Sequence, residues 1–196
     1  MKAYLGTVSG NSYKLRILLS LLKVPHEVVI IDLKNREHKG AAFLKINPRG
    51  EVPALEDGGK VIWDSAACLV YVARKFGGEQ WLPTDAAGLA EVTQWLALSA
   101  TELQCGLQYA RRGLIQGRWT LGTLEDGQNF GKVALDVCEA RLATHDWLAL
   151  DRPTIAEPAC FPYIETASEA KVALENYPHI VKWMERCKKL PGWAAR

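Results

Sequence analysis

Two short apolar runs with an amphipathic stretch between them open the chain. Residues 2–6 predict a first strand, and residues 27–33, which are β-branched and mostly apolar, predict a second, buried strand. Between them, leucines at positions 15, 18, 19 and 22 recur at helical spacing until a proline at position 25 ends the helix. A strand, a helix and a strand joined by short connections predict a βαβ unit with parallel strands.

Two further apolar runs follow, at residues 52–55 and 60–63, on either side of the Gly-rich stretch 57–59. Short runs around such a turn predict a β-hairpin. Directly after it, Asp64 or Ser65 can cap a helix that runs to about residue 76. This helix is apolar nearly all round, so we expect it to be buried.

The pattern changes beyond residue 77. Residues 78–85 show no periodicity, and no convincing strand follows them. Apolar residues at helical spacing predict a long helix over about 87–114, followed by a break at 117–127. An α/β part followed by an all-helical part indicates two domains, which we place at residues 1–77 and 86–196 with a linker at 78–85.

Three more helices are predicted in the second domain. The first carries Val133, Val137 and Ala140 at helical spacing. Thr154 and Glu157 have the spacing of a capping box and open the second helix. The last begins at a proline, at position 178, which suits the first turn of a helix.

Composition narrows the class of protein. Of the 196 residues, 48% are hydrophobic, as in globular proteins, and the formal net charge is only +2. So balanced a charge gives no reason to expect a nucleic-acid partner, and no cluster of Lys and Arg favours an anionic membrane. The N-terminus lacks the long apolar stretch of a secretory signal, and no run approaches the length of a membrane span. We therefore expect a soluble, cytoplasmic protein without a membrane partner.

The five cysteines are scattered along the chain, and none forms a C-x-x-C pair. This spacing argues against a disulfide framework, a zinc site and a dithiol redox motif. We expect buried, reduced thiols and no metal. The cysteines are Cys68, Cys105, Cys138, Cys160 and Cys187.

Three segments of the first domain could carry chemistry, and the first is the loop 7–12. It offers hydroxyl and backbone N–H groups at a helix N-terminus, where anions are stabilised. Taken alone, the loop is better interpreted as a helix cap, in which Asn11 or Ser12 satisfies the free N–H groups.

The second segment, 47–53, has the sequence N-P-R-G-E-V-P. A proline that enters a strand belongs at an edge or at a special turn. A cis Val52–Pro53 bond would expose the N–H and C=O groups of Val52 to a peptide-like ligand, whereas a trans bond would leave an ordinary loop.

The third segment is the pair Asp64 and Ser65 at the start of a helix. The hydroxyl and the free N–H groups suit a carboxylate, and the Asp64 carboxylate suits an ammonium group. An α-amino-acid head carries both charges. The alternative is again a capping pair without a ligand.

Taken together, these motifs are those of one family. Ser-x-Asn before the first helix, then N-P-R-G-x-V-P-A-L, then Asp-Ser opening the next helix resemble the soluble glutathione transferases. Residues 61–67, 81–85 and 154–157 are similar to bacterial members. The resemblance covers essentially the whole chain. It implies a thioredoxin-like α/β domain that binds glutathione and an all-α domain that binds the second substrate.

The resemblance also implies roles for individual residues. Pro53 would be a cis-proline, and Val52 would pair with the cysteinyl backbone of glutathione. Asp64 and Ser65 would hold the γ-glutamyl head.

The glycyl carboxylate of glutathione would meet Lys39, with Lys34 and His38 as weaker alternatives. Glu51 departs from the family pattern, because many members have a residue there that can meet a carboxylate.

The partner of the glutathione sulfur stays open between two residues. Ser9 lies where serine-type members place the hydroxyl that hydrogen-bonds the sulfur, and Asn11 lies where cysteine- or asparagine-type members place their key group. A free thiol has a pKa near ~8.5, so a donor at the sulfur would favour the thiolate. We expect Ser9, on the open side of the loop, to be that donor. Asn11, nearer the helix, would cap it, place the loop or donate a second hydrogen bond.

The leading interpretation is an enzyme that stabilises the glutathione thiolate for attack on small apolar electrophiles, as in detoxification. The same loop permits a glutathione-dependent disulfide reductase or peroxidase, and the scaffold also permits a non-catalytic binding protein. The family and the apolar third helix imply a homodimer. Near the second substrate, we expect Tyr109 and Trp119 to pack against neighbours and Arg111 and Arg112 to be solvated.

Overall fold

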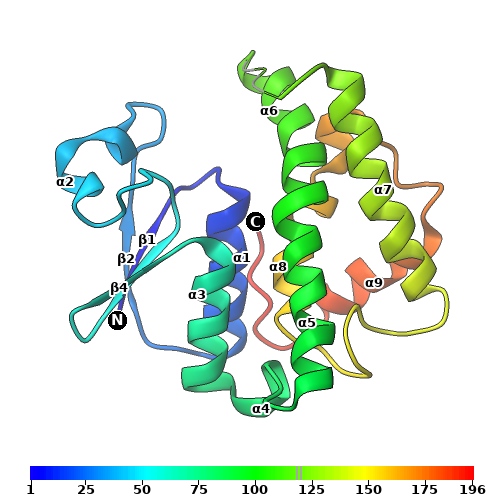
Figure 1. Cartoon of the computed structure of the whole chain (residues 1–196), viewed down its shortest axis with the longest axis horizontal. Helices are drawn as coiled ribbons and strands as arrows, with labels where there is room; N and C mark the ends of the chain where they lie inside the picture. Colours follow the sequence, from blue (N-terminus) through cyan, green and yellow to red (C-terminus); the bar gives the residue numbers. More distant parts are fainter. Residues whose placement is uncertain (118, 120) are drawn as a thin grey trace.

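A four-stranded mixed sheet lies beside a layer of helices in the computed structural model, which describes residues 1–117, 119 and 121–196 (Figure 1). The strand order is β2-β1-β3-β4; β1 pairs with β2 in parallel, and β3 is antiparallel to β1 and β4. The predicted βαβ unit and hairpin are confirmed. The strands are β1 (Lys2–Leu5), β2 (Glu27–Ile30), β3 (Ala54–Asp57) and β4 (Lys60–Trp63).

β2 is an edge strand, and the prediction that it is buried is wrong. Val28 and Ile30 are 47% and 53% exposed, because β2 is the last strand of the sheet order. Its β-branched residues suit the ladder with β1, but that pairing covers only one side of the strand.

Helices cover both faces of the sheet. α1 and α3 lie on the face that points to the second domain, and α2 lies on the other (Figure 1). Successive side chains of β1 point to opposite faces of the sheet: Ala3 and Leu5 join the main core, whereas Tyr4 packs with Phe43 of α2. The helices of this domain are α1 (Gly10–Leu21), η1 (Glu37–Lys39), α2 (Ala41–Leu44), α3 (Ser65–Val72) and η2 (Ala73–Gly77), and the short helix α4 (Gly78–Trp81) follows in the segment expected to be the linker.

The second domain is built around one long helical run. α5, η3 and α6 follow one another without a break and form the long helix that the sequence predicts, with a π-helical middle part. In Figure 1 this run stands between α1 and α3 on one side and α7 on the other. The elements of the second domain are α5 (Ala86–Leu98), η3 (Ser99–Gln108), α6 (Tyr109–Gln116), α7 (Leu124–Leu142), α8 (Ala156–Glu165), η4 (Ala167–Ala170) and α9 (Pro178–Lys188).

The face of α7 that carries Val133, Val137 and Ala140 points outward. Val133 and Val137 are 52% and 45% exposed, and Ala140 is also exposed. Close contact with η3 sets the rotation of the helix: a Cβ atom on Gly131 would lie 2.6 Å from Leu107 Cδ2. The face that packs inward therefore consists of small and apolar residues, namely Gly131, Ala134, Leu135, Cys138 and Leu142.

The predicted capping box at the start of α8 forms only in half, because Glu157 binds back to Thr154 N whereas Thr154 Oγ1 accepts a hydrogen bond from Ala156 N at 3.1 Å. Glu157 Oε2 accepts hydrogen bonds from Thr154 N at 2.7 Å and Thr154 Oγ1 at 3.1 Å, and Glu157 Oε1 accepts one from Leu148 N at 2.9 Å. Glu157 is fully buried, and this burial raises the pKa of its carboxyl to about 7. The proline that was predicted to open the last helix is Pro178, the first residue of α9.

In the described part of the chain, no helix combines the length and the apolar character that crossing a membrane requires. Four of the cysteines are buried, and Cys105 is half-buried.

Candidate active site

Ser9 caps the first helix. Its backbone is extended, with φ −85° and ψ 119°, and its Oγ accepts a hydrogen bond from Ser12 N at 3.2 Å. Ser12 Oγ in turn accepts one from Gly6 N at 3.0 Å and ties the loop to the end of β1. The prediction that Asn11 or Ser12 caps α1 is therefore wrong. Because Ser9 Oγ only accepts in this contact, its own proton is available to a ligand.

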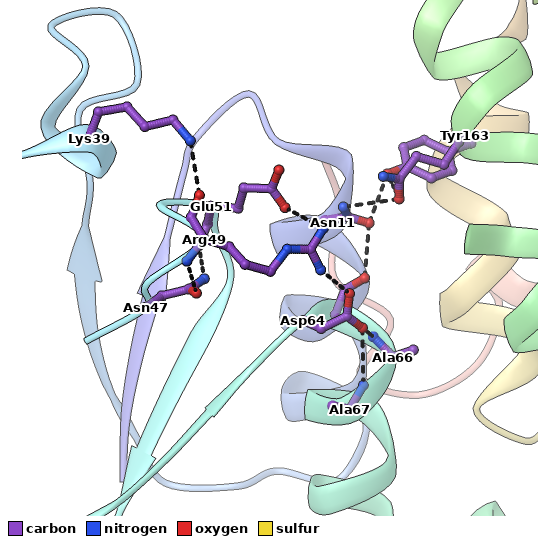
Figure 2. Close-up of polar contacts among 11 residues, drawn as sticks. Asn11, Lys39, Asn47, Arg49, Glu51, Asp64, Ala66, Ala67 and Tyr163 are labelled. Atoms are coloured by element: carbon purple, nitrogen blue, oxygen red, sulfur yellow. Dashed lines mark hydrogen bonds and ion pairs between the residues drawn. The ribbon is translucent and has the colours of Figure 1, made fainter. Parts of the chain in front are cut away.

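Asn11 joins three elements instead. Its Oδ1 accepts hydrogen bonds from Ser65 Oγ at 3.0 Å and Tyr163 Oη at 2.8 Å, and its Nδ2 donates to Gln104 Oε1 at 3.3 Å (Figure 2). Tyr163 Oη also lies 3.3 Å from Gln104 Oε1. The two partners from the second domain, on η3 and α8, are contacts of the candidate site that the sequence analysis missed. The one sequence signal that could have pointed to this contact was Gln104, a polar residue among the inward-facing leucines of the predicted long helix.

Gly10 allows this contact between the domains. A Cβ atom on Gly10 would lie 2.6 Å from Cε1 of the Tyr163 ring. Only a residue without a side chain lets the ring lie against the start of α1. Gly10, between Ser9 and Asn11, therefore allows α8 to pack closely against the start of α1.

The turn before β3 is held by a buried asparagine. Asn47 Nδ2 donates to the carbonyl of Glu51 at 2.7 Å, and its Oδ1 accepts from Arg49 N at 3.0 Å. Gly50 has φ +59°, and a Cβ atom there would lie 2.7 Å from the carbonyl oxygen of His38. The turn thus depends on the left-handed conformation and small size of glycine.

Val52 ends this turn, and the Val52–Pro53 bond is cis, as the family resemblance implies. The pairing of β3 with β1 ends at Ala54 opposite Tyr4. Val52 therefore lies outside the paired residues of the sheet.

Asp64 caps α3 from an unusual backbone conformation. Its φ of 78° is rare for a residue with a side chain, and such positions concentrate at functional sites. Asp64 Oδ1 accepts hydrogen bonds from Ala66 N at 2.8 Å and Ala67 N at 3.4 Å. The capping prediction for Asp64 is confirmed.

Arg49 bridges two carboxylates of the site, a contact that the sequence analysis did not foresee. Its Nη1 lies 3.5 Å from Asp64 Oδ2, and its Nη2 lies 3.1 Å from Glu51 Oε2 (Figure 2). All three side chains are about half exposed, so each pair adds little to stability. A ligand can therefore replace these contacts at small cost.

Lys39 lies beside the same turn. Its Nζ donates to the carbonyl of Arg49 at 3.0 Å (Figure 2). His38 is half-buried next to Gly50, and Lys34 is exposed. Lys39 therefore has a side-chain contact with the turn that leads into Val52.

The N-termini of α1 and α3 meet at this site, since Ser65 Oγ donates directly to Asn11 Oδ1. Each N-terminus carries a partial positive charge and N–H groups that point out of the helix. Two such ends side by side, with hydroxyl groups at both, form a place that suits an anionic ligand.

A buried lysine lies behind Asn11. Lys14 is 2% exposed; its Nζ donates to Ser99 Oγ at 2.8 Å and lies 4.3 Å from the centroid of the Tyr163 ring. Burial lowers the pKa of the Lys14 ammonium to about 8. The sequence analysis assigned no role to this residue.

Near the expected second substrate, the packing prediction holds for Tyr109. Its ring meets that of Trp119 edge-on at 5.9 Å, and its hydroxyl donates to the carbonyl of Gly122 at 2.7 Å. The prediction that Arg111 is solvated is wrong, because it is buried and its Nε donates to Glu169 Oε2 at 2.6 Å.

A cavity of about 20 Å³ lies next to the loop before α1. It is lined by residues 7–10 and by three arginines, Arg16, Arg111 and Arg196, among others. Two larger cavities of about 390 Å³ each lie at the C-terminal end of α7, around His145 and Asp151. Across residues 1–117, 119 and 121–196, no group of three or more His, Cys, Asp or Glu side chains could hold a metal ion.

Comparison with known proteins agrees with this geometry. Residues 8–75 match the model of the glutathione S-transferase N-terminal domain, and residues 129–191 match that of the glutathione S-transferase C-terminal domain. The chain is 30% identical to the glutathione S-transferase sirG of Leptosphaeria maculans, over 95% of this chain and 84% of that protein. It is 32% identical to a maleylpyruvate isomerase of Ralstonia sp, over 98% and 94%.

A solved structure described as a possible glutathione S-transferase, from Rhodopseudomonas palustris, has the same fold. It superposes with a TM-score of 0.90 at 32% identity and covers 99% of this chain and 96% of its own.

Proposed function

This chain belongs to the glutathione S-transferase family and is a transferase, and we propose that glutathione binds where the N-termini of α1 and α3 meet. The observation that carries this proposal is the hydrogen bond from Ser65 Oγ to Asn11 Oδ1, which joins the two helix starts. Glutathione has two carboxylates and an ammonium group, so it needs both positive and negative partners. The site offers both.

The γ-glutamyl head binds at the start of α3. Its carboxylate takes the hydroxyl of Ser65 and the positive end of the helix, and its ammonium group takes the Asp64 carboxylate. The ammonium replaces or shares the contact that Arg49 now makes with Asp64 Oδ2 at 3.5 Å.

The rest of glutathione follows the turn before β3. The backbone of Val52, next to Pro53 and outside the paired sheet, pairs with the cysteinyl residue as an added strand would. Lys39, which contacts the same turn through the carbonyl of Arg49, meets the glycyl carboxylate. This places the sulfur toward the loop before α1.

Ser9 is the donor to the sulfur. Its proton is free of the capping contact, and it lies at the positive end of α1. The glutathione thiol gives its proton to solvent, and the thiolate attacks an electrophilic carbon of a small apolar co-substrate and displaces a leaving group such as chloride, with Ser9 as electrostatic stabiliser rather than nucleophile. Asn11 is the second catalytic candidate, but both ends of its amide already bind protein groups, which supports Ser9.

The assembly and the boundaries of the domains belong to the same proposal. We place the domains at residues 1–77 and 86–196, because α5 begins at Ala86 after the short helix α4. A homodimer is supported by apolar side chains that stay exposed on β4 and after α3: Val61, Trp63 and Phe76 are each 41–43% exposed. A cytoplasmic location stays a prediction.

The test is calorimetric titration with glutathione, followed by a conjugation assay with a chloronitrobenzene. We expect a dissociation constant in the micromolar to millimolar range, about −4 to −8 kcal/mol of binding free energy. No heat and no thermal shift at millimolar glutathione would overturn the proposed site. The reductase, peroxidase and non-catalytic alternatives are not favoured by the relatives that are named as glutathione S-transferases, such as sirG.

Isomerisation of an unsaturated keto acid is a second candidate function. One relative, 32% identical, is a maleylpyruvate isomerase. Three arginines line the cavity next to Ser9; Arg111 and Arg196 are paired with Glu169, which leaves Arg16 as the guanidinium that forms no ion pair among the described residues. Guanidinium groups bind carboxylates well. Turnover of maleylpyruvate in the presence of glutathione, measured beside chloronitrobenzene conjugation, decides between the two activities.

A further inference from the structure

We propose that Asn11 couples occupancy of the γ-glutamyl position at Ser65 to the helical domain, through an exchange of hydrogen bonds with Tyr163. The inference rests on the proposed glutathione site. It concerns a residue that acts through others: Asn11 is the positioning residue, and Tyr163 is its support.

Ser65 has one hydroxyl proton, and in this structure it goes to Asn11 Oδ1 at 3.0 Å. An incoming carboxylate brings acceptors only, so it needs donors from the protein. The N–H groups of Ala66 and Ala67 are already engaged by Asp64 Oδ1, at 2.8 and 3.4 Å. The carboxylate therefore takes its donors from Ser65, the backbone N–H at the first position of α3 and the hydroxyl, and its binding takes the hydroxyl proton away from Asn11.

Asn11 Oδ1 then keeps one donor, the Tyr163 hydroxyl at 2.8 Å. That hydroxyl is shared in the free protein with Gln104 Oε1, which lies 3.3 Å away. Since a hydroxyl has a single proton, loss of the Ser65 contact commits the Tyr163 proton to Asn11. Binding at α3 thus changes a bond between α1 and α8.

Tyr163 cannot leave this position easily. It is 2% exposed, its ring lies against Gly10, and the Lys14 ammonium lies 4.3 Å from the centroid of the same ring. A fixed donor at Tyr163 keeps Asn11 satisfied in the bound state. Suppose that a ligand of the helical domain displaces Tyr163. By reciprocity, it weakens glutathione binding by the same factor by which glutathione weakens the binding of that ligand.

A double-mutant cycle tests the exchange. Without the Tyr163 hydroxyl, glutathione binding strips Asn11 Oδ1 of its last donor, so Tyr163→Phe should weaken binding roughly tenfold. In the Ser65→Ala background, Asn11 loses nothing when the ligand binds, so Tyr163→Phe should leave the dissociation constant unchanged. Calorimetry with glutathione and with S-methylglutathione, which lacks the thiol proton, measures all four proteins.

Tyr109→Phe is the matched control. Tyr109 is also a buried tyrosine of the helical domain, but its hydroxyl bonds with Leu121 N and Gly122 O. Its loss should leave glutathione affinity unchanged in both backgrounds.

The outcomes separate this inference from the proposed function. A wild type that binds glutathione, with equal effects of Tyr163→Phe in both backgrounds, overturns the exchange and leaves the site intact. A wild type that binds no glutathione overturns both.

If the Tyr163→Phe protein does not fold, a second measurement on the wild type tests the exchange. The side-chain amide resonance of Asn11 in the wild type, assigned by its loss in Asn11→Ala, should shift when S-methylglutathione saturates the protein. An unchanged resonance would overturn the exchange.

Discussion

The Lys14 ammonium lies 4.3 Å from the centroid of the Tyr163 ring and donates to Ser99 Oγ at 2.8 Å. The charge is buried where α1 meets η3 and α8, the contact between the two domains. Within the part of the chain that the structure describes, no carboxylate forms an ion pair with it. A buried cation supported by one hydroxyl and one aromatic ring costs stability as long as it stays protonated.

Lys14→Met should therefore change how stability depends on pH. The folded-state pKa is lowered from 10.5 to about 8, so between these values the unfolded chain binds the extra proton and wild-type stability rises with pH. Below pH 8 both states are protonated and the cost is constant, about 3 kcal/mol at full extent. The methionine variant should be more stable than wild type at pH 7, and this advantage should shrink between pH 8 and 10.5.

Urea unfolding at pH 7, 8.5 and 10 measures the difference for Lys14→Met. Lys182→Met, on the exposed side of α9, controls for the loss of a surface charge. A constant difference between Lys14→Met and wild type across this range would contradict the prediction.

Substitutions at Ser9 should separate its capping role from its role at the sulfur. Ser9→Ala loses the α1 cap and about 1 kcal/mol, whereas Ser9→Gly loses only a few tenths. Both remove the hydroxyl, so both should raise the pKa of bound glutathione to a similar degree and slow conjugation at neutral pH. Thiolate absorbance against pH, with chemical unfolding of the same proteins, gives the two quantities. If only Asn11→Ala changes the thiolate titration of bound glutathione, an asparagine-type mechanism, which favours disulfide reductase activity, replaces the serine-type mechanism.

Asp64→Asn should keep the fold and lose ligand affinity. Asparagine has the same size and shape as aspartate and keeps an oxygen for Ala66 N, but it has no charge for the ammonium group of glutathione. Asp64→Ala loses the cap as well and must adopt the strained backbone, so it should unfold more easily by about 1–2 kcal/mol. A glutathione analogue without the α-amino group should bind wild type and Asp64→Asn equally. Unequal binding of that analogue would refute the ammonium contact.

Glu157→Gln should remove a pH dependence that wild type has on the acid side. Burial raises the pKa of this carboxyl from 4.5 to about 7, so the folded state holds a proton that the unfolded state releases. That contribution to stability is present below pH 4.5 and is lost as the pH rises through 7. In Glu157→Gln, the NH2 group of the new amide also points a donor at a backbone N–H group. This mismatch should lower the free energy of unfolding by about 1–3 kcal/mol.

Unfolding free energies at pH 5 and pH 8 check the Glu157 prediction. The gap between wild type and Glu157→Gln should be larger at pH 5. A gap that is the same at both values, or larger at pH 8, would show that the group is ionised in the fold.

Trp63→Glu should shift the protein from dimer to monomer if β4 lies in the subunit contact. Light scattering at micromolar concentration measures the mass. Phe130→Glu, at an equally exposed aromatic residue on α7, is the control and should leave the dimer intact. A monomeric wild type would contradict the homodimer.

The sequence by itself determined the features that depend on neighbouring residues. The hairpin at 57–59, the Asp64 cap and the contact of Glu157 with Thr154 N each involve groups a few residues apart, so their spacing in the chain reports their geometry. The three segments with candidate chemistry were identified in the same way. The order of these local signals along the chain was also enough to reveal the family.

The tertiary structure alone decided which groups from distant segments meet. Only the packed fold shows that β2 is an edge, that α7 turns Gly131 rather than Val133 inward, and that Asn11 binds Tyr163 instead of capping α1. Asn11 and Tyr163 are 152 positions apart. An amide can satisfy its hydrogen bonds with a nearby N–H or with a distant hydroxyl, and the choice depends on which helix packs close enough to offer one.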